Sequence, residues 1–142
     1  NDPIFLEKSR NANRAWEKNN KNKVNERAKR YRDTHKDDEF YRFKKGIRTC
    51  ITRSFSRNKN YFFKDKSSEE LLGCSIDYFI SYITSLFKPG MTLDNYGEWE
   101  LDHIIPINSA SSKEEIEKLN KYTNFQPLWK HDNRIKSDKI IF

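Results

Sequence analysis

The sequence has no hydrophobic segment of the ~20 residues that a membrane-crossing helix needs, and no signal-peptide pattern at its start. A transmembrane protein is therefore excluded at this level, and no membrane partner is expected. Only two cysteines are present, Cys50 and Cys74, too few for a disulfide-stabilised miniprotein or a four-cysteine zinc site. We interpret both as small buried thiols in a reducing compartment.

Hydrophobic residues are also scarce, at 35% of the 142 residues, whereas aromatic residues make up 14%. A wholly disordered chain is poor in aromatic residues. The composition therefore predicts a packed core that spans only part of the chain.

Acidic residues are scarce in the first half of the chain. Residues 1–66 contain 20 Lys and Arg against 9 Asp and Glu, whereas residues 67–142 contain 8 against 12. The whole chain has a net charge of +7. We therefore predict a basic helical arm over 1–66 that binds a polyanion. A separate domain over 67–142 keeps its carboxylates for another purpose, such as binding a metal cation.

Two helices are expected within the basic segment. Residues 6–33 have few apolar positions and four clustered asparagines, which predicts a polar helix that orders on its partner; a solvated tail is the alternative. Residues 38–57 carry an apolar stripe at helical spacing, and no acid lies between Glu39 and Asp65. We interpret the polar face of this second helix as a phosphate-binding surface rather than an ordinary solvated face. The basic residues expected to contact nucleic acid here are Arg27, Arg30, Arg42, Lys45, Arg48, Arg53 and Arg57.

The second segment alternates short helices with two strands. Ser67 and Ser75 are predicted N-caps of two helices, and Gly73 ends the first of them. The strands are expected at 97–106, running into a turn, and at 124–129. Further helices are expected at 112–121, after a capping box, and from 132 or 133 to 138. The predicted fold class is therefore α+β and helix-rich.

The adjacent residues Asp102 and His103 are the first candidate site. Neighbouring side chains on a strand point to opposite faces, so the pair suits two separate roles. A carboxylate can hold a hard divalent cation, and an imidazole with a pKa near neutrality can take a proton from water. Hydrolysis of a phosphodiester needs both groups. The dipeptide alone more often marks a surface turn, so the assignment depends on the residues that follow it.

Three separated blocks of the sequence resemble the HNH endonuclease family. They are WELDHIIP at 99–106, NFQPL at 124–128 and DNRIKSDK at 132–139, in the order and spacing of the H-N-N variety of HNH domains. Less specifically, the basic N-terminal segment, Leu-Gly-Cys at 72–74 and Pro-Gly-Met at 89–91 resemble small phage-type HNH proteins. The resemblance implies a ββα-metal motif at the C-terminal end, in which two antiparallel strands and a helix surround one divalent cation.

The resemblance also implies roles for individual residues. His103 would be the general base, and Asp102 and Asn133 the metal ligands. Asn124 would brace the loop and hold the His103 ring through a backbone hydrogen bond. Because the Cys-x-x-Cys pairs of many family members are absent and the two ligands are oxygen donors, Mg²⁺ or Mn²⁺ is expected, with no structural zinc. The basic residues expected near the scissile phosphate are Arg134, Lys136 and Lys139.

These inferences predict a metal-dependent endonuclease that nicks or cuts double-stranded DNA, in the cytoplasm of a bacterial or phage-infected cell. Two alternatives stay open. One is a non-catalytic nucleic-acid-binding module of the same shape, and the other is a nuclease subunit docked on a phage or other protein assembly. A homodimer is a further arrangement that the sequence leaves open. His35 and His131 are interpreted as lying outside the metal site.

Overall fold

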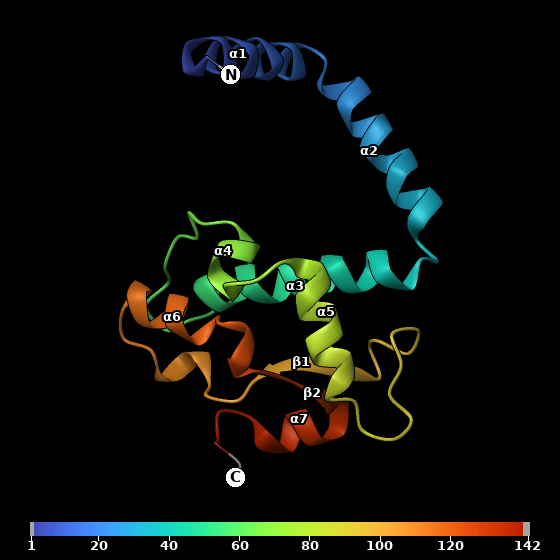
Figure 1. Cartoon of the computed structure of the whole chain (residues 1–142), viewed down its shortest axis with the longest axis vertical. Helices are drawn as coiled ribbons and strands as arrows, with labels where there is room; N and C mark the ends of the chain where they lie inside the picture. Colours follow the sequence, from blue (N-terminus) through green and yellow to red (C-terminus); the bar gives the residue numbers. More distant parts are fainter. Residues whose placement is uncertain (1, 141–142) are drawn as a thin grey trace. The chain divides into compact units, whose positions relative to one another are not determined.

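The computed structural model describes residues 2–140. Over that range the chain forms seven α-helices, two short 3-10 helices and one two-stranded antiparallel sheet (Figure 1). This composition confirms the predicted helix-rich α+β class. The chain divides into two compact units between Asp38 and Glu39. The division precedes the second basic helix, whereas the sequence analysis placed the boundary after residue 66.

The first unit consists of two polar helices, α1 (Pro3–Asn19) and α2 (Lys21–His35), where one helix was expected. Asn20 separates them, and its side-chain amide donates to the carbonyl of Trp16 at 2.8 Å. Asparagine side chains compete with the backbone for such hydrogen bonds, so the asparagine-rich middle of the segment interrupts the helix. Neither of these two described helices contains a buried residue.

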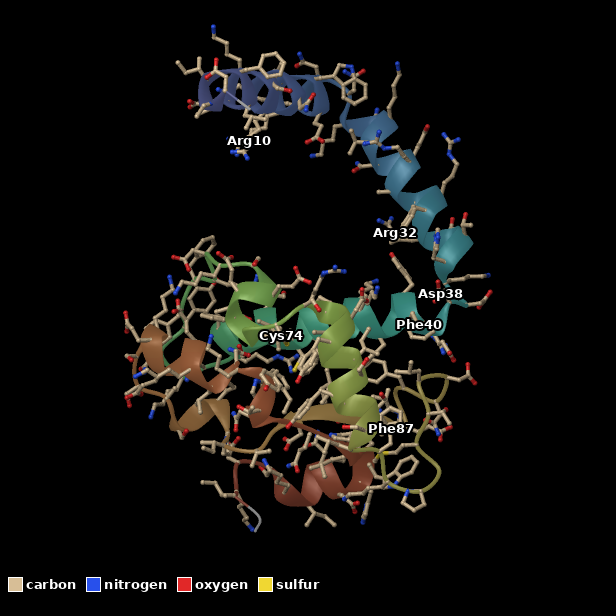
Figure 2. The ribbon with its side chains drawn as sticks, viewed as in Figure 1. Arg10, Arg32, Asp38, Phe40, Cys74 and Phe87 are labelled. Atoms are coloured by element: carbon tan, nitrogen blue, oxygen red, sulfur yellow. The ribbon has the colours of Figure 1, made fainter. Side chains whose placement is uncertain are left out.

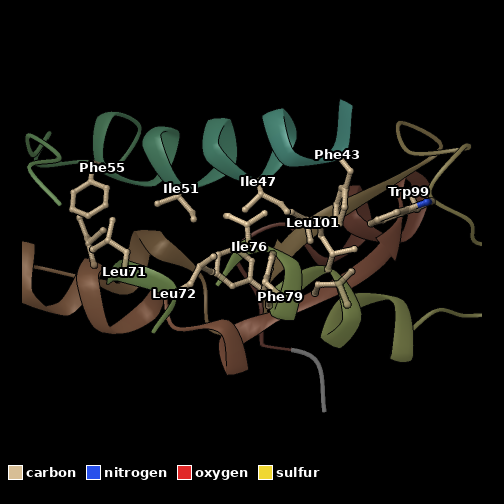
Figure 3. Packing of buried hydrophobic residues seen from close by; sticks show 14 of the residues in the cluster. Phe43, Ile47, Ile51, Phe55, Leu71, Leu72, Ile76, Phe79, Trp99 and Leu101 are labelled. Atoms are coloured by element: carbon tan, nitrogen blue, oxygen red, sulfur yellow. The ribbon is translucent and has the colours of Figure 1, made fainter. Parts of the chain in front are cut away.

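The second unit is organised around α3 (Glu39–Ser56), which buries most of the predicted apolar stripe. Phe40, at the start of the stripe, is 49% exposed. Four members that recur every four residues are each 1% exposed or less: Phe43, Ile47, Ile51 and Phe55. It packs in one hydrophobic core with α4 (Ser68–Leu72), α5 (Ile76–Ser85) and Trp99 (Figure 3). Burial of each large apolar side chain contributes roughly 1.5–3 kcal/mol, which is why α3 belongs to this unit.

The helices α4 and α5 begin at the residues that the sequence predicts. Ser67 accepts from the Glu70 backbone N–H at 3.2 Å, and the Glu70 carboxylate accepts from the Ser67 N–H at 2.7 Å. Gly73 ends α4 in the left-handed conformation, with φ of 76°. Ser75 then caps α5 by accepting from the Tyr78 N–H at 3.1 Å. These local caps fix the chain path that leads into the core.

A glycine lets the loop before the sheet close against α3. A Cβ atom added to Gly46 would lie 2.5 Å from the hydroxyl oxygen of Tyr96. Tyr96 packs edge-on against Phe43 and Trp99, with ring centroids 5.1 and 5.0 Å away. Glycine in a helix interior costs about 1 kcal/mol relative to alanine, and here close packing requires it.

The sheet lies between helices. The strand β1 (Trp99–His103) pairs antiparallel with β2 (Phe125–Trp129), and Asp102 lies opposite Gln126. Figure 1 shows α7 (Lys130–Lys136) on one face of this sheet and α3 with α5 on the other. The two faces therefore have different surroundings.

The chain between the strands makes one excursion, as predicted. It contains the 3-10 helix η1 (Ile107–Ser109), α6 (Lys113–Leu119) and the 3-10 helix η2 (Tyr122–Asn124). Ser112 caps α6 by accepting from the Glu115 N–H at 3.2 Å, as predicted. The Glu115 carboxylate accepts from the Ser111 N–H rather than from that of Ser112, so the expected capping box is only half formed. The final helix α7 follows β2 directly and begins earlier than the expected residues 132 or 133.

Candidate functional site

The alternation of β1 places the two candidate residues on opposite faces of the sheet, as predicted. Asp102 faces α7, where it meets Lys136. His103 faces the core, and its ring lies against Phe125 with ring centroids 4.3 Å apart. Because His103 is the last residue of the strand, both side chains still line one cleft of about 570 Å³.

The imidazole of His103 is held by a residue that the sequence analysis missed. Its Nε2 lies 3.0 Å from the side-chain oxygen of Asn120, a buried residue that ends α6. Burial is the main cause that lowers the pKa of His103, and the nearby Lys136 ammonium lowers it further. The hydrogen bond to Asn120 and the Asp102 carboxylate oppose this shift without cancelling it. His103 is therefore a neutral imidazole at neutral pH, as a general base must be.

The carboxylate of Asp102 is paired with a buried lysine. Lys136 is 1% exposed, and its Nζ lies 3.1 Å from Asp102 Oδ2 and 2.9 Å from the carbonyl oxygen of His103. Gln126, across the sheet, donates to the same carboxylate at 2.9 Å. Lys136 was predicted near the scissile phosphate, and it does line the same cleft as Asp102 and His103. Its ammonium, however, is used by the Asp102 carboxylate, which is itself only 12% exposed and needs a partner.

Asn133 lies on the face of α7 that meets the sheet. Its side-chain nitrogen donates to Glu100 Oε2 at 2.9 Å. Asn133 and Lys136 are one helical turn apart, and Glu100 and Asp102 are two strand positions apart, so the two pairs face each other. This double match is the signal that could have identified Glu100 and the buried Lys136 from the sequence.

Asn124 braces the loop that follows β1, as the family resemblance implied. Its side-chain oxygen accepts from the Ile105 N–H at 2.9 Å, and its side-chain nitrogen donates to the Leu119 carbonyl at 2.8 Å. Its backbone oxygen accepts from the Ile104 N–H at 2.8 Å. The second expected contact is different, because the hydrogen bond to the His103 ring is made by Asn120. No periodicity or spacing in the sequence pointed to Asn120.

The basic face of α3 lines the same cleft as the candidate residues. Four of the five basic residues predicted for residues 38–57 contribute to the wall: Arg42, Lys45 and Arg53 on α3, and Arg57 directly after its end. Arg48 is exposed but is not among the residues that line the cleft. Arg42 is anchored by donating to the carbonyl of Asp94 at 2.8 Å. The cleft therefore combines one acidic and one cationic wall.

The thiol of Cys50 also lines the cleft, where it is neutral. Burial and the nearby Asp102 carboxylate raise the pKa of Cys50 to about 12. Burial likewise raises the pKa of Tyr96 to about 12. Both groups therefore stay protonated at neutral pH, and neither supplies a thiolate or phenolate to the cleft.

The other predicted contact residues are not among those that line this cleft. Arg134 and Lys139 are exposed on and just after α7. Arg27 and Arg30 belong to the first unit, where they line a groove of about 670 Å³ together with Trp16. Arg10 and Arg32 are exposed on the same unit (Figure 2).

Among the described residues, no helix is both long and apolar enough to span a membrane.

The α7 face of the sheet carries oxygen donors of the kind that hard divalent cations bind. Asp102 and Glu100 offer carboxylates, and Asn133 offers an amide oxygen because its nitrogen is used by Glu100. Within residues 2–140 no three His, Cys, Asp or Glu side chains group as a metal site. A cation at Asp102 would share that carboxylate with the Lys136 ammonium.

Comparisons with known proteins identify relatives without a described activity. The chain is 31% identical to uncharacterized protein L426 of Acanthamoeba polyphaga mimivirus over 124 residues. The matched segment covers 84% of this chain and 53% of the relative. The chain is also 29% identical over 124 residues to uncharacterized protein L246 of the same virus, with coverage of 84% and 53%. The chain thus spans about half the length of the curated relatives it matches. No protein-family model and no solved structure match the chain.

Proposed function

We propose that this chain is a metal-dependent endonuclease of the HNH type that hydrolyses phosphodiester bonds in double-stranded DNA. The observation that carries the proposal is a single cleft lined by a neutral imidazole, a carboxylate and several basic side chains. Phosphodiester hydrolysis needs these three groups, for activation of water, cation binding and phosphate contact.

Each residue of the site has a role in this proposal. His103 takes a proton from the attacking water through Nδ1, the ring nitrogen that does not contact Asn120. Asp102 and Asn133 hold Mg²⁺ or Mn²⁺, and Glu100 orients the Asn133 amide. When bound, the cation neutralises charge on the phosphate and the leaving oxygen. Asn124 keeps the loop after β1 in place.

Contacts with DNA are proposed on three surfaces. The basic wall of α3 would lie along the phosphates next to the scissile bond, because it faces Asp102 and His103 across the cleft. Arg48, Arg134 and Lys139 would contact phosphates outside the cleft, where they are exposed. The first unit, through Arg27 and Arg30, would add a non-specific grip that weakens as salt rises.

A plasmid-nicking assay tests the proposal directly. The full chain, stripped of metal with EDTA, should convert supercoiled plasmid to open-circular or linear DNA only after Mg²⁺ or Mn²⁺ is added. The same samples should be analysed for DNA binding by a mobility shift without metal. Binding without any metal-dependent cleavage would reject the endonuclease and favour a binding module.

A second candidate function, a nucleic-acid-binding module without turnover, is favoured by one specific observation. The Asp102 carboxylate already has a resident cation in the buried Lys136 ammonium, 3.1 Å away. A site whose acidic side chain is fully compensated can preserve its shape without a divalent ion. The metal dependence of nicking separates the two candidates.

The pH dependence of cleavage follows from the environment of His103. Burial lowers its pKa below the ordinary 6.5, and only the protonated imidazole is inactive as a base. Cleavage should therefore persist as the pH falls through 6.5 and decline only at more acidic pH. Single-turnover nicking rates at saturating Mg²⁺, recorded between about pH 4.5 and 8, measure this acidic decline in the cleavage rate. An acid limb centred above 6.5 would contradict the assignment.

A further inference from the structure

Two residues outside the family motif form a hydrogen-bonded path from α3 to the imidazole. Asn120 is 0% exposed and lies at the end of α6. Its side chain joins the His103 ring to Ser54, a buried residue of α3. We propose that Asn120, supported by Ser54, is a positioning residue that fixes the orientation and tautomer of His103, so that Nδ1 is the basic nitrogen. This inference rests on the proposed endonuclease function.

The direction of each hydrogen bond in this path can be assigned from its partners. Ser54 Oγ lies 2.6 Å from the carbonyl oxygen of Ile51, which only accepts, so the hydroxyl proton goes there. Ser54 Oγ then accepts from Asn120 Nδ2 at 2.7 Å. The same nitrogen donates to the carbonyl oxygen of Ile116 at 2.9 Å. Both amide protons of Asn120 are therefore used.

The assignment of Asn120 determines the tautomer of His103. With its nitrogen directed at Ser54 and Ile116, Asn120 presents its oxygen to His103 Nε2 at 3.0 Å. An amide oxygen only accepts, so Nε2 must carry the proton. In the neutral ring the lone pair is then on Nδ1. A flipped Asn120 amide would set its oxygen against the Ile116 carbonyl, where no proton is available.

Two further contacts hold the ring face and the strand end at His103. Phe125 packs against its face, with ring centroids 4.3 Å apart. Lys136 donates to the backbone oxygen of His103 at 2.9 Å, which holds the strand end. Ser54 lies next to Arg53, which lines the cleft. The packing of α3 therefore sets the position of its basic side chains and of the His103 ring at the same time. This matters because a small displacement of a catalytic group lowers the reaction rate by a large factor.

Asn58 offers a matched control. It is also a buried asparagine of the second unit, and its side-chain nitrogen donates to two carbonyl oxygens, those of Ile107 and Ala110, at 2.9 and 3.2 Å. It therefore loses a comparable set of hydrogen bonds on truncation. Because it holds the η1 segment rather than the imidazole, it reports the structural cost alone.

The test compares cleavage rate, DNA affinity and the state of the imidazole in the full chain. Asn120→Ala should lower the single-turnover nicking rate about tenfold to hundredfold while changing DNA affinity little, and Ser54→Ala should lower the rate less. Asn58→Ala should leave the rate of the folded fraction near that of the wild type. Equal rate losses in Asn120→Ala and Asn58→Ala, at matched folded fractions, would overturn the proposal.

Nitrogen-15 spectra of the histidine rings provide a readout that does not depend on cleavage. The chain has 3 histidines, so His103 is assigned from the signals lost in His103→Ala. The wild type should show a slowly exchanging proton on Nε2 and none on Nδ1, with faster exchange in Asn120→Ala. A proton on Nδ1 would overturn the positioning role. If the wild type binds DNA without cleaving it, the endonuclease fails, and the location of this proton still decides the role of Asn120.

Discussion

Replacing His103 by alanine is expected to lower the rate of plasmid nicking by about 10²–10⁴-fold, the usual contribution of a general base. The physical reason is that a half-buried, neutral imidazole is the cleft residue suited to accept a proton from water at neutral pH. Metal-free DNA affinity should stay nearly unchanged, because the basic wall of α3 supplies the phosphate contacts. Nicking rates under single-turnover conditions and mobility shifts measure the two quantities.

Two further variants show whether this loss is chemical or structural. His131 is exposed on α7, so His131→Ala should cleave like the wild type. His103→Gln keeps an amide N–H that can face Asn120 and tests the base without leaving a cavity beside Phe125. Loss of cleavage together with an equal loss of binding would assign His103 a folding role instead.

Replacing Lys136 by methionine is expected to destabilise the second unit by about 3–5 kcal/mol when no divalent metal is present. The substitution removes a 1%-exposed ammonium and leaves the Asp102 carboxylate, whose side chain is 12% exposed, without its cation. If Asp102 binds a divalent cation, saturating Mg²⁺ should recover roughly 2–3 kcal/mol by binding the folded state. Urea unfolding with EDTA and with Mg²⁺ measures both free energies.

Controls for this prediction separate charge from packing. Lys139→Met changes an exposed residue beyond the end of α7, and its stability should stay within about 0.5 kcal/mol of the wild type. The double variant Asp102→Asn with Lys136→Met removes both charges and should be more stable than the single variant in EDTA. A single variant as stable as the wild type in EDTA would show that the ion pair contributes little. A loss that Mg²⁺ leaves unchanged would weigh against a cation at Asp102.

Local features of the fold could be predicted because their signals lie within a few residues. Ser67, Ser75 and Ser112 cap helices where the sequence indicates, and the stripe of α3 is buried as its spacing requires. The break at Asn20 was missed, since the asparagine cluster was interpreted only as weakening one helix. The predicted division after residue 66 follows charge, whereas the two compact units follow packing and divide between Asp38 and Glu39.

The site could be predicted only in part. The three blocks of sequence pointed to Asp102, His103, Asn124 and Asn133. The strand pair and the final helix are present in the expected order, and Asn124 lies in η2 directly before β2. Glu100, and the pairing of Lys136 with Asp102, could have been predicted from the two-residue period of the strand and the turn of the helix. Asn120 and Ser54 could not, because neither lies at a motif position and their meeting depends on how α6 packs on α3.

Local sequence patterns indicate the charge division, the starts of α4, α5 and α6, the amphipathic face of α3 and the separation of Asp102 from His103 on a strand. Which partner each of these groups has depends on the tertiary packing. His103 meets Asn120 across 17 residues, Asn133 meets Glu100 across 33 and Lys136 meets Asp102 across 34. Short-range patterns carry no information on such contacts. They follow from the sheet register and from the requirement that buried polar and charged groups find partners.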